Sequence, residues 1–175
     1  MSAKSSPLDF VPTSVIKACR GTFAHIIARL ANLSFDHAMF PARFKMAQVT
    51  PLIKKYGLDK NDPGNYRPIS NLNTVSKIIE RLALARIAPH VTTSPSFDPM
   101  QSAYRRRHST ETALLKITND IYEGFDNRQS TILVALDQSA AFDCIDHSTL
   151  ISRLQHTFGV TGQALAWLSS YLQSR

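Results

Sequence analysis

Three carboxylates lie close together in the segment LDQSAAFDCIDH, which spans residues 136–147: Asp137, Asp143 and Asp146. Asp137 directly follows an apolar run, and a carboxylate at the end of a buried strand is costly unless it is paired or binds a metal. Phosphoryl transfer by two magnesium ions requires carboxylate oxygens on a rigid platform that holds the metals roughly 3.5–4 Å apart. The segment therefore predicts a metal-binding position at Asp137. The alternative for this residue is a turn or helix cap just past the strand.

The elements that must position Asp137 follow from hydrophobic periodicity and turn residues. Residues 131–136 are a short apolar run rich in β-branched side chains, the pattern of a strand buried on both faces. Two earlier strands, 47–55 and 66–71, each contain a proline and flank a turn-rich link, which predicts an exposed two-stranded arm. Helices are predicted from residue 13 or 14 to about residue 35 with Gly21 as a weak point, from 73 or 74 until Pro89 stops the helix, and over 109–125, 147–159 and 161–172.

The net charge of +7 is divided unevenly along the chain. Residues 1–107 hold sixteen Lys and Arg against six Asp and Glu, a net +10, and residues 108–175 hold four against seven, a net −3. A basic half followed by an acidic half suits a protein that binds phosphates with one part and a divalent metal with the other. A basic surface with no nucleic-acid partner would have a similar composition.

Composition and cysteine spacing narrow the class of protein. An apolar content of 43% over 175 residues is enough to form a core, and no apolar run approaches the roughly 18 residues that a membrane span needs. These features predict a soluble intracellular chain without a membrane segment. Cys19 and Cys144 lie in apolar or mixed segments with no metal-ligand spacing, which favours two buried thiols over zinc or a disulfide framework.

Three segments in order resemble the reverse transcriptases of LINE (non-LTR retrotransposon) elements. FPARFKMAQVTPLIKKYGLDKNDPGNYRPISNLNTVSKIIERLALARI (residues 40–87) is similar to the first fingers motifs of that family, QSAYRRRHSTETALLKITNDI (residues 101–121) to the second, and LDQSAAFDCIDH to motif A of the palm. The opening LDFVPTSVIKAC and the closing WLSSYLQSR resemble the flanks found in the CR1/L2/Rex-like group. The resemblance covers nearly the whole chain.

The resemblance implies roles for single residues around one nucleotide. Asp137 matches the motif A aspartate that binds the catalytic Mg2+ ions. Phe142 matches the aromatic steric gate that excludes a 2′-hydroxyl; the alternative is a core aromatic. Arg67 matches the fingers arginine that clamps the triphosphate, since a forked guanidinium fits phosphate oxygens. Lys54 and Lys55 are further substrate-binding candidates on the neighbouring strand, and their alternative is a solvated face.

The same resemblance predicts a template-contacting segment. Gln101, Tyr104, Arg105 and Arg106, followed by Arg107, match residues that track the nucleic acid, where arginine meets phosphate and an aromatic ring can stack on a base. Three consecutive arginines cannot all face one groove, so we expect one or two of them to contact nucleic acid. Two positions depart from the family pattern: Gln138 replaces a more apolar residue, and Arg107 stands where a glycine is frequent.

The resemblance implies an α+β fold, with reverse-transcriptase fingers, a partial palm, and helices around an incomplete antiparallel sheet. It implies a helical extension over 1–39, fingers over 40–129 and a partial palm over 130–175. The implied partners are an RNA template, a DNA primer and deoxynucleoside triphosphates, in the cytoplasm and nucleus. The sequence does not indicate an oligomeric state.

Motifs B and C of the family, with the remaining metal-binding carboxylates, are absent from the 175 residues. The chain alone is therefore expected to be inactive, because Asp137 cannot organise two metal ions by itself. The alternative function is a remnant of a decayed element that binds nucleic acid or protein without polymerising. An open reading frame downstream that encodes an Asp-Asp turn would favour the polymerase over the remnant.

Overall fold

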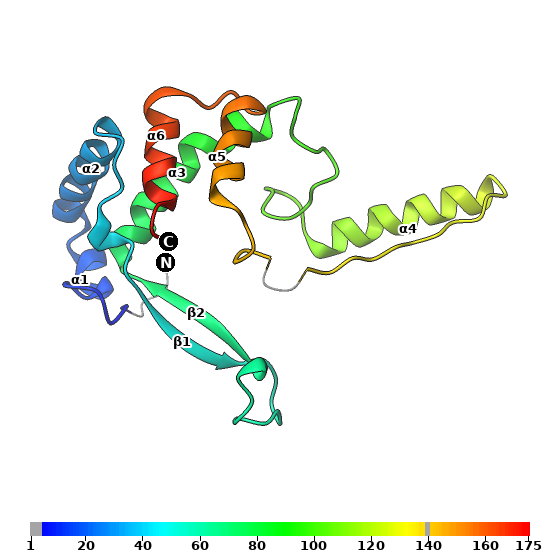
Figure 1. The fold of residues 1–175 in the computed structure, drawn as a ribbon, viewed down its shortest axis with the longest axis horizontal. Coiled ribbons are helices and arrows are strands. Elements are labelled where there is room, and N and C mark those ends of the chain that lie inside the picture. Colours follow the sequence, from blue (N-terminus) through cyan, green and yellow to red (C-terminus); the bar gives the residue numbers. More distant parts are fainter. Residues whose placement is uncertain (1–4, 139–140) are drawn as a thin grey trace. The chain divides into compact units, whose positions relative to one another are not determined.

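The computed structural model describes residues 5–138 and 141–175 and divides into two compact units. Unit 1 combines Met1–Ser94 with His147–Arg175, and unit 2 is Pro95–Asp146. The described residues form helices and one two-stranded antiparallel sheet (Figure 1), which confirms the predicted α+β class.

Unit 1 contains five helices and the sheet among its described residues. In chain order its elements are α1 (Thr13–Ala18), α2 (Arg20–Asp36), the 3-10 turn η1 (Ala42–Phe44), β1 (Ala47–Ile53), η2 (Pro63–Asn65), β2 (Tyr66–Leu72), α3 (Thr74–Thr92), α5 (His147–His156) and α6 (Gly162–Leu172). The helices form a body from which the two strands project as an arm (Figure 1). The predicted arm is confirmed, with strand ends within two residues of the expected positions.

Two predicted helix boundaries were wrong. The first helix breaks at Cys19, which leaves the helical region (φ −101°, ψ 35°), and not at Gly21. Helix α3 continues through Pro89 to Thr92. Proline removes one backbone donor, but it lies in the last turn, where the hydroxyls of Thr92 and Thr93 bond to the carbonyls of Ala88 and Pro89 at 2.8 Å.

The two strands of the arm pair in a regular register that places their prolines opposite each other. The register runs from Ala47↔Leu72 to Ile53↔Tyr66 and includes Pro51↔Pro68. Since neither proline has an N–H, this pair must occupy a ladder position that exchanges no backbone hydrogen bonds, which an antiparallel sheet provides at alternate positions. The prolines are thus compatible with the sheet and fix where its hydrogen-bonded pairs lie.

The core of unit 1 joins helices that are far apart in sequence. Its buried residues are Ala31 of α2, Phe40, Ile79 and Ala83 of α3, and Trp167 of α6. Trp167 packs against three aromatic rings, with centroid distances of 5.3 Å to Phe35, 5.5 Å to Phe40 and 5.6 Å to Tyr171. Its indole N–H donates to Ser34 Oγ at 2.9 Å. Trp167 therefore fastens α6 to α2 across 133 residues.

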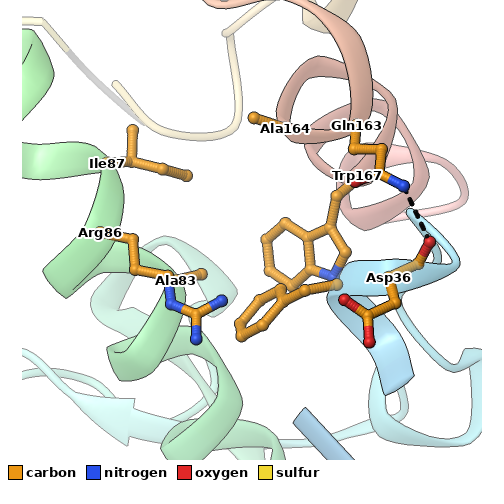
Figure 2. A pocket seen from close by; sticks show the side chains of 8 residues that line it. Asp36, Ala83, Arg86, Ile87, Gln163, Ala164 and Trp167 are labelled. Carbon is orange, nitrogen blue, oxygen red and sulfur yellow. Dashed lines mark hydrogen bonds between the residues drawn. The ribbon is translucent and has the colours of Figure 1, made fainter. Parts of the chain in front are cut away.

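A hollow of about 230 Å³ opens beside this core (Figure 2). Arg86 lies over the Phe35 ring at 4.4 Å on one wall. At the other, the Gln163 amide donates to the Asp36 carbonyl at 3.1 Å. None of the site residues predicted from the sequence lines this hollow.

Unit 2 consists of the loop 95–109, helix α4 (Thr110–Asp126) and the segment that follows it. Ser109 caps α4 as predicted: its hydroxyl accepts from the Thr112 N–H at 3.2 Å, and the Thr112 hydroxyl accepts from the Ser109 N–H at 2.9 Å. Glu111 lies in the first turn, where its pKa is lowered by hydrogen bonding to Ser109 and to its own backbone. The apolar side of α4 remains largely exposed, at residues such as Leu114 and Phe125.

The predicted strand over 131–136 was wrong for the described chain. These residues have no strand pairing, and Ile132, Val134 and Leu136 are 87%, 71% and 92% exposed. The β-branched run favours an extended conformation, but a strand also needs a partner for its backbone groups, and unit 2 supplies none among its described residues. Asp137 consequently follows an unpaired, exposed segment.

The two cysteines lie in an environment that differs from the predicted one. Cys19 and Cys144 are exposed, so the prediction of two buried thiols was wrong. Cys19 ends the short helix α1, where a side chain lies outside the core.

None of the helices in residues 5–138 and 141–175 has the length and apolar character of a membrane span.

Candidate nucleotide and nucleic-acid interface

The arm presents Arg67 on one of its two faces. Arg67 lies on β2 opposite Leu52 of β1, and its side chain is exposed. Because side chains alternate along a strand, Arg67 shares its face with Thr50 and Ile69. The described hydrogen bonds and ion pairs involve no side-chain partner of Arg67, so its guanidinium is available to an anion.

The opposite face of the arm is apolar and hollowed. A depression of about 480 Å³ is lined by Val49, Pro51, Tyr66 and Pro68 of the strands together with Lys60, Asn61 and Pro63 of the connecting loop. The Tyr66 hydroxyl donates to the Lys60 carbonyl at 2.9 Å, which ties the loop to the strand. Sequence reasoning missed Tyr66 as an organiser of the loop, although its alternation with Arg67 was visible in the motif YRPIS.

The two lysines of the arm differ in their surroundings. The Lys54 ammonium donates to the Gly64 carbonyl at 2.7 Å, and its backbone N–H donates to the Asn65 carbonyl at 2.8 Å. Lys55 is exposed at the start of the connecting loop. Lys54 therefore helps close the loop. The described hydrogen bonds include none from the Lys55 ammonium.

In unit 2, the predicted template segment is organised by Arg105. Its guanidinium donates to the carbonyls of Pro99 at 2.7 Å and Gln101 at 3.5 Å and lies 5.5 Å from the centre of the Phe97 ring. Arg105 is half-buried, whereas Arg106 is exposed. Arg105 is thus directed inward, an arrangement that was not predicted, and neither was its partner Phe97. The expectation that one or two of the three arginines contact nucleic acid stays a prediction.

Two residues of this segment have the left-handed backbone conformation: Tyr104 has φ 59° and Arg107 has φ 64°. Residues other than glycine adopt this backbone conformation at a cost in free energy, whereas glycine adopts it freely. A glycine at position 107 would adopt this conformation without that cost. At Tyr104 it accompanies a ring that is 89% exposed.

The structure brings together two predicted residues of unit 2, Tyr104 and Phe142. Their ring centroids lie 6.2 Å apart in an edge-on arrangement with an interplanar angle of 73°. Phe142 is 72% exposed, so the alternative of a core aromatic is wrong for the described structure. An exposed aromatic pair in a loop offers faces on which bases or sugars can stack.

Asp137 provides one carboxylate on the exposed segment of unit 2. Its oxygens are of the hard type that Mg2+ prefers. In the part of the chain that the structure describes, no group of three or more Asp, Glu, His or Cys side chains could hold a metal ion. Asp137 can therefore serve as one ligand, but these residues do not complete a metal site by themselves. Arg67, Lys54 and Lys55 belong to unit 1, whereas Asp137 and Phe142 belong to unit 2.

The chain belongs to the reverse transcriptase (RNA-dependent DNA polymerase) family, whose model matches residues 53–175. This family transfers nucleotides with the help of divalent metal ions, and it acts on nucleic-acid templates and primers. The chain is of the LINE type: it is 31% identical to a probable RNA-directed DNA polymerase from transposon BS of Drosophila melanogaster, over 98% of this chain and 19% of that protein.

Two further relatives from Drosophila melanogaster agree with this assignment. The RNA-directed DNA polymerase from the mobile element jockey is 27% identical, and a probable RNA-directed DNA polymerase from the transposon X-element is 30% identical. Each comparison covers 95% of this chain and 18% of the relative, so the chain spans about a fifth of the length of these proteins. The finer placement in the CR1/L2/Rex-like group stays a prediction. No solved structure gives a significant match to the chain.

Proposed function

We propose that this chain forms the fingers and the first palm segment of an RNA-directed DNA polymerase that extends a 3′-hydroxyl with deoxynucleoside triphosphates. The match of residues 53–175 to the reverse transcriptase family carries the proposal. Residues 1–39 are a helical extension, 40–129 the fingers and 130–175 a partial palm in this proposal. Its partners are an RNA template and a DNA primer, and as a retrotransposon protein it acts in the cytoplasm and nucleus.

Arg67, Lys54 and Lys55 of unit 1 and Phe142 of unit 2 are the candidates for nucleotide contact. Arg67 contacts the triphosphate, helped by Lys54 and Lys55, because an exposed guanidinium on a strand can bond two phosphate oxygens at once. Phe142 lies against the sugar and excludes a 2′-hydroxyl. The exposure of Arg67 and Phe142 supports these roles, since a ligand can reach both side chains.

The metal ion is Mg2+, and Asp137 is its ligand from this chain. When bound, such an ion neutralises charge on the reacting phosphates. The Asp137 carboxylate would supply one oxygen ligand to such an ion. Other ligands must be supplied from outside the described residues, so the chain alone does not polymerise.

Gln101, Tyr104, Arg105 and Arg106 belong to the proposed nucleic-acid-binding segment. Arg106 meets a phosphate, Tyr104 offers an aromatic face to a base, and Arg105 holds the loop in shape through its bonds to Pro99 and Gln101. The concentration of basic residues in the first 107 residues supports this role, because neutralised phosphates release counterions.

Binding of a fluorescein-labelled RNA-template/DNA-primer duplex tests the proposal. Anisotropy titrations between about 50 and 200 mM salt should show log affinity falling linearly with log salt, by roughly 0.7–0.9 for each phosphate contacted. Arg106→Ala should reduce the steepness by about one contact. Arg153→Ala, which removes an exposed arginine of α5, should leave it unchanged. Absence of binding, or a slope that Arg153→Ala lowers and Arg106→Ala does not, would overturn the proposed interface.

A further inference from the structure

A carboxylate near the start of the chain bonds to the first turn of helix α3. Asp9 Oδ1 accepts from the Thr74 N–H at 2.5 Å. Its Oδ2 accepts from the Thr74 hydroxyl at 2.8 Å, from the Ser6 N–H at 2.7 Å and from the Thr13 hydroxyl at 3.4 Å. Thr13 and Thr74 are buried, and their hydroxyl oxygens lie 2.8 Å apart. Asp9 therefore bonds both to its sequence neighbours and to a residue 65 positions further along the chain.

The first turn of α3, to which Asp9 bonds, also directly follows the arm in the chain. Strand β2 ends at Leu72, and α3 begins two residues later at Thr74. Within this turn Asn73 accepts from the Ser76 N–H at 2.7 Å, so Asn73 and Asp9 cap neighbouring donors of one helix. The Ser76 hydroxyl donates to the Phe44 carbonyl at 2.8 Å, three residues before β1 begins. Both strands of the arm are thus attached to the turn that Asp9 holds.

Charge strengthens this attachment. Burial raises the pKa of the Asp9 carboxyl, but the hydrogen bonds from Thr74, Ser6 and Thr13 together outweigh that effect, and its pKa is lowered. The carboxylate is therefore ionised at neutral pH, where hydrogen bonds to it are about twice as strong as those between neutral groups. Its negative charge also lies at the N-terminus of α3, which the helix dipole favours.

We propose that Asp9 is a positioning residue of the polymerase: by bonding to Thr74, it holds the arm in one direction relative to α3. The proposal rests on the proposed function because that function gives the arm its ligand, the triphosphate at Arg67. Asp9 lies outside the residues that match the family model, which begin at residue 53. The segment before the matched region is thus part of the machinery that places the arm.

Distance measurements between two spin labels test the positioning directly. One label is placed at the tip of the arm by Asn61→Cys and the other on α3 by Arg81→Cys, with Cys19 and Cys144 replaced by serine. Both labelled positions are exposed and belong to unit 1. With Asp9 intact, we expect a single narrow distance distribution. Asp9→Asn keeps the shape of the side chain but removes its charge and one acceptor, and should broaden or split the distribution.

Hydrogen exchange separates positioning from general destabilisation. In Asp9→Asn, the Thr74 amide should exchange faster by a factor on the order of ten or more, the loss expected for a bond to a charged acceptor. Amides of α6 should keep their protection, because the Trp167 core is not altered. Asp36→Asn, an exposed acid whose side chain makes no described bond, should change neither measurement.

An unchanged distance distribution and unchanged Thr74 exchange in Asp9→Asn would overturn the proposal. If Asp9→Asn unfolds unit 1, the same measurements are made on Thr13→Val. This variant removes only the Thr13 hydroxyl from the group formed by Asp9, Thr13 and Thr74. This variant should broaden the distribution to a smaller extent, and an unchanged distribution would overturn the proposal as well. Neither measurement uses a nucleotide, so its outcome is independent of whether Arg67 binds phosphate.

Discussion

Replacing Trp167 by phenylalanine should weaken unit 1 by an amount that the structure allows to be worked out. Trp167 is 4% exposed, contacts rings from α2, the following turn and α6, and donates to Ser34. The smaller ring loses roughly 40 Å² of buried apolar surface, worth about 1 kcal/mol. The cavity left behind costs about 1 kcal/mol more. The lost indole hydrogen bond adds about 1 kcal/mol.

The expected loss of about 3 kcal/mol is a large part of the 5–15 kcal/mol that a domain of this kind typically has. Urea unfolding followed by circular dichroism measures it, since Trp167 is the only tryptophan and its fluorescence disappears with the substitution. Tyr56→Phe, at a fully exposed ring, should change the unfolding free energy by less than about 0.5 kcal/mol. A loss below about 1 kcal/mol for Trp167→Phe would refute the conclusion that this side chain fastens α6 to α2.

Three further predictions concern the interface and the N-terminal cluster. Arg105→Ala should accelerate amide exchange over residues 99–108, because it removes the bonds to Pro99 and Gln101, whereas Arg106→Ala should not. The lowered pKa of Asp9 gives stability that is present above its unfolded value of about 4 and is lost as pH falls through the lower folded value, so acid unfolding of Asp9→Asn should lack this component. Primer extension by the chain on poly(rA)/oligo(dT) with Mg2+ should be undetectable, and incorporation that depends on Asp137 would contradict the incomplete metal site.

Local signals predicted the parts of the fold that local interactions determine. Ser109 caps α4 because its hydroxyl reaches the first turn of the same helix. The arm was predicted from two proline-containing strands around a turn-rich link, and the facing pair Pro51↔Pro68 shows why prolines are tolerated there. The continuation of α3 through Pro89 was not predicted; the proline lies in the last turn of the helix, where it removes only one backbone donor.

Contacts between distant parts of the chain could not be predicted in the same way. Nothing in the sequence around Asp9 indicates a bond to Thr74, and nothing around Ser34 indicates a bond to Trp167. For residues 131–136 the sequence predicted a strand that the structure lacks. Their residue types favour a strand, but pairing requires a neighbouring strand that the described residues do not contain. Residue type therefore indicates a conformation, and tertiary partners decide whether it becomes a sheet.

The sequence predicted which residue types form the candidate site, but only part of how the structure arranges them. The exposure of Arg67, Arg106 and Phe142 agrees with ligand-contacting roles, which stay proposals. The inward direction of Arg105 was not assigned in advance, because it depends on the carbonyls of Pro99 and Gln101 and on the Phe97 ring. The approach of Tyr104 to Phe142 depends on how the loop of unit 2 folds back and has no local signal.

Photocrosslinking tests the central claim, that this chain holds a template and primer, most directly. An RNA template that carries 4-thiouridine near the primer end is bound to the chain, irradiated and mapped by mass spectrometry. The account predicts crosslinks within residues 101–107, centred on Tyr104, and at Phe142, and predicts that excess unlabelled duplex abolishes them. Crosslinks confined to α2, α5 and α6, or none under conditions where the duplex is bound, would contradict it.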